Sequence, residues 1–81
     1  DGPLITTLYI DTVYSVLYVE MNEESTCEYA GEEFVYGEGA SMTGTNSTYH
    51  EASLDRFLYY IECVDKYGNY GDYIVDTTFW V

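Results

Sequence analysis

Residues 57–64, Phe-Leu-Tyr-Tyr-Ile-Glu-Cys-Val, constrain the fold more than any other segment of this chain. They are mostly apolar or aromatic, and they run directly into Asp-Lys-Tyr-Gly-Asn, a composition typical of a tight turn. Such side chains pack well on a pleated surface, so we predict a central β-strand. Alternation places Phe57, Tyr59, Ile61 and Cys63 on one face and Leu58, Tyr60, Glu62 and Val64 on the other.

Six further segments are predicted to be strands, separated by polar or glycine-rich stretches. They are residues 3–10, 14–21, 26–30, 33–37, 48–54 and 73–81, with turns or loops at 22–25, 38–48 and 65–72. Within residues 14–21, the odd positions Leu17, Val19 and Met21 suit the core. Short strands at this spacing predict an all-β fold, a single seven-stranded immunoglobulin-like β-sandwich domain over residues 1–81.

Two features indicate an extracellular or cell-surface location. Cys27 and Cys63 are the two cysteines of the chain, and we interpret them as one disulfide formed in an oxidising compartment. Two buried free thiols are the alternative. Asn46-Ser47-Thr48 is an N-glycosylation acceptor sequence in a loop rich in Ser, Thr and Gly, so we predict a glycan on Asn46.

The charge balance excludes several classes of partner. Fifteen acidic residues face only Lys66 and Arg56, which gives a formal net charge of −13. Such a surface repels phosphate and argues against nucleic acid and anionic lipid. No stretch approaches the ~20 apolar residues of a membrane span. We interpret acidic pairs such as Glu23-Glu24 and Glu32-Glu33 as a solvated rim, the alternative being a cation site with several convergent oxygens.

Nothing in the sequence predicts catalysis. The single histidine, His50, lies on a predicted strand, and we interpret it as a surface or hydrogen-bonded residue rather than a general base. The sequence has no glycine-rich phosphate loop and no zinc-ligand spacing. We therefore expect a protein that is not an enzyme and uses no cofactor.

The chain from Ser25 onward, about two thirds of its length, resembles a known group of repeats. Ser-Thr-Cys-Glu-Tyr-Ala-Gly at residues 25–31, Tyr-His-Glu-Ala-Ser-Leu at 49–54 and the segment 57–69 are similar to fibronectin-III-like and immunoglobulin-like repeats of bacterial and archaeal surface proteins. The matching positions are Thr26, Cys27, Tyr29, Met42, His50, Tyr59, Tyr60, Cys63, Asp65, Gly68, Asn69, Ile74, Phe79 and Val81.

The chain departs from that pattern in two places. The connection before residue 57 is shorter than in the repeats, and Phe57 stands where they have a tyrosine whose hydroxyl ties down the corner. The resemblance implies an immunoglobulin-like fold and extracellular placement. It also implies a spacer, an adhesive module or an assembly unit, with little information on chemistry.

Aromatic residues on predicted outer faces indicate a contact surface, because the solvent face of a sheet is ordinarily polar. The predicted assembly interface consists of Tyr14, Val16, Tyr18, Leu58, Tyr60, Val64 and Trp80. A shift of one residue at a bulge would instead place them inside.

We therefore expect a structural subunit of an extracellular filament or surface array. It would form a homo-oligomer by stacking these faces, or by adding an edge strand such as residues 3–10 to a neighbour. One alternative is a carbohydrate-binding or adhesive module in which exposed rings stack on a glycan. Another is a spacer repeat of a larger cell-surface protein.

Overall fold

The computed structural model describes residues 2–80, except for the side chains of Phe79 and Trp80. Its elements are β1 (Ile5–Asp11), β2 (Val16–Ala30), β3 (Ala40–Ser41), β4 (Ser47–Ser53), β5 (Leu58–Asp65), β6 (Tyr70–Asp76) and a 3-10 helix, η1 (Thr77–Trp80). All strand pairs are antiparallel. The predicted all-β fold is confirmed, but residues 2–80 form six strands instead of the expected seven. No helix among these residues has the length and apolar character needed to cross a membrane.

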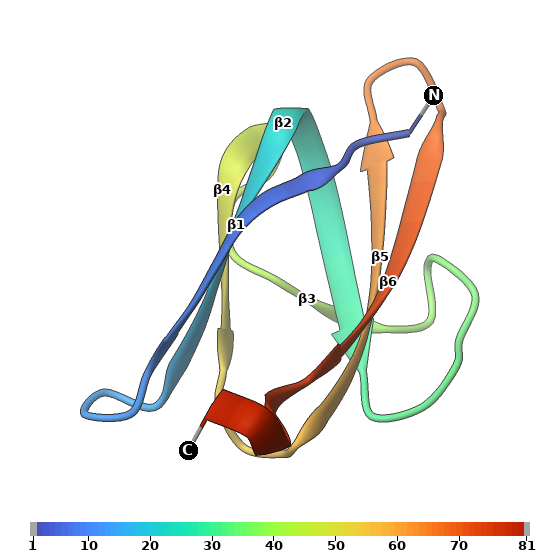
Figure 1. The fold of residues 1–81 in the computed structure, drawn as a ribbon. Coiled ribbons are helices and arrows are strands. Elements are labelled where there is room, and N and C mark those ends of the chain that lie inside the picture. Colours follow the sequence, from blue (N-terminus) through green and yellow to red (C-terminus); the bar gives the residue numbers. More distant parts are fainter. Residues whose placement is uncertain (1, 81) are drawn as a thin grey trace.

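The long strand β2 gives the sheet its shape (Figure 1). Residues 16–21 of β2 lie between β1 and β4, whereas residues 25–30 pair with β5, and residues 28–29 also with β3. Because β6 pairs with β5, the sheet curls into two halves that share β2. We call β1, residues 16–21 and β4 the first half, and β3, residues 25–30, β5 and β6 the second half.

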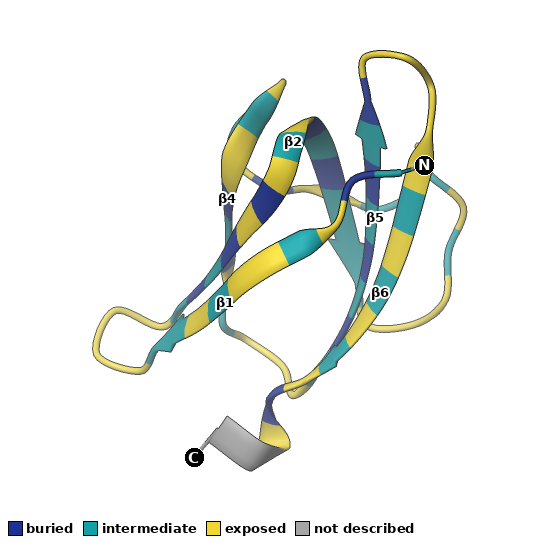
Figure 2. Cartoon of the chain, turned by 45° about the horizontal axis from the view of Figure 1, so that its top comes forward, coloured by how far each residue is buried: buried dark blue, intermediate teal, exposed yellow. Residues whose placement is uncertain are grey.

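The core lies between the two halves, and burial alternates along β2 and β5 (Figure 2). The side chains that meet there include Leu17, Val19, Met21, Tyr59, Ile61 and Cys63. The predicted inner positions of both strands are therefore confirmed for these residues. Phe57, which alternation also placed inside, precedes β5 and is 65% exposed.

Residues 22–25, predicted as a turn, are extended and belong to β2. The Asn22 N–H donates to the Leu4 carbonyl, and the Leu4 N–H donates to Asn22 Oδ1, both at 2.8 Å. Ser25 is buried where β2 passes between the halves, and it pairs with both Ser47 and Asp65. Pairing with distant segments thus overrides the local turn preference of these polar residues.

Residues 33–37, predicted as a strand, are part of an irregular loop over residues 31–39. The Glu28 carboxylate accepts N–H groups from Gly37 at 2.7 Å and Gly39 at 3.2 Å, which satisfies backbone donors without a neighbouring strand. Gly37 has φ 104°, a conformation that favours glycine. The strand after this loop is the two-residue β3, inside the stretch predicted as loop.

The last predicted strand, residues 73–81, is shifted toward the N-terminus. β6 begins at Tyr70 and ends at Asp76, and η1 follows it. The Asp76 carboxylate accepts the Thr78 N–H at 2.9 Å, as a helix N-cap does. The Thr77 N–H and hydroxyl both donate to the Phe57 carbonyl, at 2.7 and 2.8 Å. These bonds turn the chain out of the sheet.

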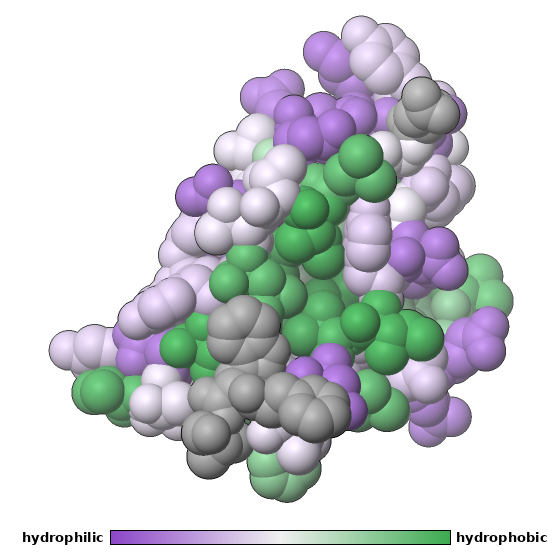
Figure 3. All heavy atoms as spheres, viewed as in Figure 1, coloured by the Kyte–Doolittle hydropathy of each residue, from purple (hydrophilic) through white to green (hydrophobic). Residues whose placement is uncertain are grey.

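Residues 2–4 join the two halves at one end. The Tyr73 hydroxyl donates to the Pro3 carbonyl, and a Cβ atom added to Gly71 would lie only 2.4 Å from the same oxygen. A glycine is therefore needed where these two segments approach. Beyond this contact, Figure 3 shows apolar side chains gathered between the two halves. Those of β1 and β6 that pack partly buried against the core include Ile5, Leu8, Ile10 and Val75.

Candidate functional site

The predicted disulfide is present and joins the two longest strands. Cys27 of β2 and Cys63 of β5 are directly opposite in the antiparallel register, with 4.1 Å between their Cα atoms. Both are fully buried, and the described chain contains no free cysteine. The alternative of two free thiols is therefore wrong, and neither sulfur is available as a nucleophile.

His50 is fully buried and hydrogen-bonded. Its Nδ1 lies 2.9 Å from the Thr43 carbonyl, which can only accept, so Nδ1 carries the proton. Nε2 is then free to accept from the Ser25 hydroxyl at 3.3 Å. The prediction of a hydrogen-bonded histidine is confirmed. Ser25 is also fully buried, so this serine–histidine pair is closed to a substrate.

The outer face of the second half is largely aromatic and aliphatic. Directly opposite residues of paired strands share a face, and Tyr60 is opposite Ile74 while Val64 is opposite Tyr70. Three predicted interface residues, Leu58, Tyr60 and Val64, lie half-buried on this face. Ile74 and Tyr70 were not predicted as part of it, yet they are 65% and 57% exposed. Only the register of β5 with β6 reveals them.

An acidic row crosses the same face. Glu28, Glu62 and Asp72 are directly opposite one another on β2, β5 and β6. Like charges in this position destabilise a sheet. Burial raises the pKa of Glu62, and the carboxylates of Asp72, Glu28 and Glu33 raise it further. The negative charge of Glu62 is therefore unfavourable at this position, and a bound proton or a nearby positive charge would relieve it.

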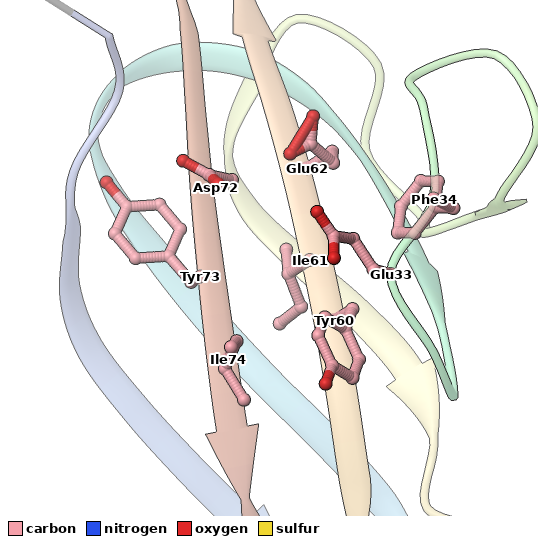
Figure 4. Close-up of a pocket in the computed structure, with 8 residues that line it drawn as sticks. All are labelled: Glu33, Phe34, Tyr60, Ile61, Glu62, Asp72, Tyr73 and Ile74. Atoms are coloured by element: carbon pink, nitrogen blue, oxygen red, sulfur yellow. The ribbon is translucent and has the colours of Figure 1, made fainter.

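A hollow of about 520 Å³ opens over this face (Figure 4). Its lining residues are Glu33, Phe34, Tyr60, Ile61, Glu62, Asp72, Tyr73 and Ile74. Figure 4 shows Glu33 and Phe34 of the 31–39 loop on one side of β5, and Asp72 and Ile74 of β6 on the other. The lining of this hollow thus combines three carboxylates, those of Glu33, Glu62 and Asp72, with apolar and aromatic side chains. Within the described chain, no group of three or more His, Cys, Asp or Glu side chains is arranged to hold a metal ion.

Three tyrosines form a row across the outer face of the first half. Tyr9 of β1 is directly opposite Tyr18 of β2, with 5.8 Å between ring centroids, and Tyr49 of β4 lies 5.7 Å from Tyr18 on the other side. Tyr9 is 58% exposed and Tyr49 39%. Only Tyr18 was predicted here. Tyr9 and Tyr49 could be found only once β1 and β4 were known to flank β2.

A second hollow, of about 300 Å³, lies over this tyrosine row. It is lined by Thr7, Tyr9, Asp11, Tyr18, Glu20 and Tyr49. Glu51 of β4 is directly opposite Tyr18. Burial raises the pKa of Tyr18 and of Tyr49, and the Glu51 carboxylate raises both further. Both phenols therefore stay neutral, with a proton to donate, well above neutral pH.

The remaining predicted interface residues show that the set is not one surface. Tyr14 lies in the β1–β2 turn and is 77% exposed, and Val16 is half-buried at the start of β2. The Trp80 side chain lies outside the described residues. Tyr14, Val16 and Tyr18 thus belong to the first half and its turn, whereas Leu58, Tyr60 and Val64 belong to the second.

The two basic residues are engaged with aromatic rings. Arg56 pairs with Asp55 at 2.8 Å, and its guanidinium lies 5.4 Å from the Tyr29 ring and 5.7 Å from the Tyr59 ring. Lys66, in the β5–β6 turn, lies 5.3 Å from the Tyr67 ring. Neither is among the residues that line the two hollows, which therefore have carboxylates as their only charged side chains.

The predicted glycosylation site is in an exposed turn. Asn46 precedes β4, has φ 51° and is exposed, as is Thr48 of the acceptor sequence. The Asn46 N–H donates to Thr26 Oγ1 at 3.1 Å, which fixes the backbone of this turn against β2. Attachment of a glycan to Asn46 stays a prediction.

Comparison of the chain with protein-family models, with curated proteins and with solved structures found no match. The resemblance to surface-protein repeats therefore stays a prediction.

Proposed function

We propose that this chain is a non-catalytic structural unit of an extracellular filament or surface array, built on an immunoglobulin-like β-sandwich. The chain crosses between the halves within β2, between β3 and β4, and between β4 and β5, as Greek-key sandwiches do. The Cys27–Cys63 disulfide suits an oxidising compartment, and the exposed acceptor sequence at Asn46 suits the same setting.

The exposed apolar surface of the second half carries this proposal. Ile74 is 65% exposed beside Tyr60, and Tyr70 is 57% exposed beside Val64. On a sheet face that contacts only water, the outward positions ordinarily carry polar side chains. Exposed apolar and tyrosine-rich surface, here two patches on either side of the Glu62–Asp72 pair, is instead typical of protein interfaces.

The free strand edges offer a second mode of contact. In the described sheet, β1 and β6 each pair with a neighbour on one side only. An unpaired edge can accept a strand from another chain. A face or edge that binds a different surface of the next copy repeats head-to-tail and produces an open fibre.

The acidic row sets a condition for this assembly. Stacking two copies brings the carboxylates of Glu28, Glu62 and Asp72 close to acidic groups of the neighbour. Repulsion between such strongly negative molecules falls when salt screens the charges or acid neutralises them. Assembly is therefore favoured at low pH or high ionic strength.

Electron microscopy and sedimentation velocity of the native, disulfide-bonded protein test the proposal across pH and salt. We expect ordered filaments or sheets that a Tyr60→Ser/Ile74→Ser double variant loses while it stays folded. Val13→Ser is the matched control, since Val13 is 83% exposed in the β1–β2 turn. Assemblies that survive the double substitution would refute the role of this face. Single dispersed domains under every condition would favour a spacer repeat.

A further inference from the structure

We propose that the tyrosine row on the first half binds a neutral saccharide. The row, Tyr9–Tyr18–Tyr49, spans three adjacent strands, and its outer rings are well exposed. Strands hold these rings more rigidly than a loop would. The hollow above them, about 300 Å³, is at the lower end of the volumes that small ligands occupy. Tyrosine combines a broad apolar ring with a hydroxyl, and so suits a ligand with apolar C–H surfaces and many hydroxyls.

The carboxylates around the row select the type of ligand. Asp11 and Glu20 line the hollow, and Glu51 is directly opposite Tyr18. Ionised carboxylates only accept hydrogen bonds, and sugar hydroxyls are donors that can satisfy them. The tyrosine hydroxyls can in turn donate to sugar oxygens. A neutral saccharide therefore matches both groups in the hollow.

Other occupants match this surface less well. A nucleic acid or an acidic polysaccharide would bring negative charge against three carboxylates. A second copy of this chain, with its formal charge of −13, would do the same at neutral pH and low salt, where assembly through the second half is also opposed. The lining residues of the hollow include no basic side chain to offset that repulsion.

The inference is independent of assembly, because the tyrosine row and the Tyr60–Ile74 face lie on different halves of the sheet. The Tyr60→Ser/Ile74→Ser variant is therefore expected to lose filaments but to bind saccharide as the wild type does. Either property can fail without the other.

Native affinity electrophoresis of the whole disulfide-bonded chain tests binding, using a soluble β-glucan, xylan, mannan and dextran as probes. We expect at least one to retard the protein. A Tyr9→Ala/Tyr49→Ala variant should bind roughly tenfold more weakly, because two stacking contacts are lost. Tyr67→Ala is the matched control, since Tyr67 is 76% exposed in the β5–β6 turn. Thermal unfolding of each variant confirms that it is folded.

Three outcomes would overturn the inference. One is no retardation by any of the four neutral polysaccharides. Another is retardation that the Tyr9→Ala/Tyr49→Ala variant retains in full. The third is equal retardation by heparin, an acidic polysaccharide, which would contradict the charge argument. A Glu51→Gln variant adds a separate check, since it should weaken neutral-sugar binding while every tyrosine stays in place.

Discussion

The buried Tyr59 side chain anchors the β4–β5 connection by a hydrogen bond to the backbone of Ser53. Its hydroxyl donates to the Ser53 carbonyl at 2.5 Å and accepts the Asp55 N–H at 3.1 Å. The resemblance to surface-protein repeats placed such a tie at residue 57, which is Phe in this chain. The structure has the tie two residues later, on a tyrosine that is fully buried.

Replacement of Tyr59 by Phe should destabilise the domain, because it removes the hydroxyl and leaves the Ser53 carbonyl and Asp55 N–H without this partner. Loss of a buried hydrogen bond costs about 1–3 kcal/mol. Urea unfolding followed by fluorescence measures the change in free energy. Tyr60→Phe is the control on the adjacent outer position, expected to change stability by less than ~0.5 kcal/mol. Equal effects of the two variants would show that the tie contributes nothing.

The disulfide should contribute roughly 3–4 kcal/mol to the free energy of unfolding. It closes a loop between residues 36 positions apart and so lowers the conformational entropy of the unfolded chain. A Cys27→Ala/Cys63→Ala variant and wild-type protein in reductant should both unfold at lower urea concentrations. Alkylation of the native protein should label neither cysteine. An unfolding midpoint that reductant leaves unchanged would contradict this prediction.

Stability should fall with acid partly through Asp65. The Asn69 N–H and the Tyr67 N–H donate to Asp65 Oδ1, both at 2.9 Å, and these bonds hold the pKa of Asp65 below its usual value. As pH falls, the Asp65 carboxylate therefore becomes protonated at a lower pH in the folded state than in the unfolded chain. The stabilisation is complete above the ordinary aspartate pKa of about 4 and is lost as pH falls through the folded value.

Thermal unfolding between pH 2 and 6 measures this effect. Asp65→Asn should lower the melting temperature at pH 6 and flatten its dependence on pH. Glu38→Gln is a control for the loss of one negative charge, since Glu38 is exposed in the 31–39 loop and lies outside the acidic row. Parallel pH curves for wild type and Asp65→Asn would exclude Asp65 as a source of acid sensitivity.

Glu62→Gln should stabilise the domain at neutral pH, because it removes the central charge of the acidic row. Relief of like charges across a strand pair is worth roughly 0.2–1 kcal/mol. Since burial and the neighbouring carboxylates raise the pKa of Glu62, the repulsion is present above that pKa and disappears as pH falls through it. The gain should therefore shrink in acid, as urea unfolding at two pH values would show.

The same variant bears on assembly. Glu62→Gln should raise light scattering at neutral pH and low salt if copies stack through this face, whereas Glu38→Gln, in the exposed 31–39 loop, should not. Identical scattering from the two variants would argue against assembly through this face.

Local pattern predicted the strands that are rich in apolar and aromatic residues, and the side of each strand that faces the core. Alternation placed Leu17, Val19 and Met21 inside β2, and Tyr59, Ile61 and Cys63 inside β5, and the structure confirms both. The cysteine pair followed from its position on two such strands. These features were readable because each residue's own preference for water or core carries the information.

Contacts between distant segments decided the rest. Asn22–Ser25 became strand rather than turn because Leu4, Ser47 and Asp65 pair with it. The Tyr9–Tyr18–Tyr49 row exists because β1 and β4 flank the same part of β2. The sequence by itself determined that β2 and β5 are strands and which of their residues face the core. Only the tertiary structure decided which strands are neighbours and in what register, because strand pairing joins residues far apart in the chain and no local pattern encodes the choice.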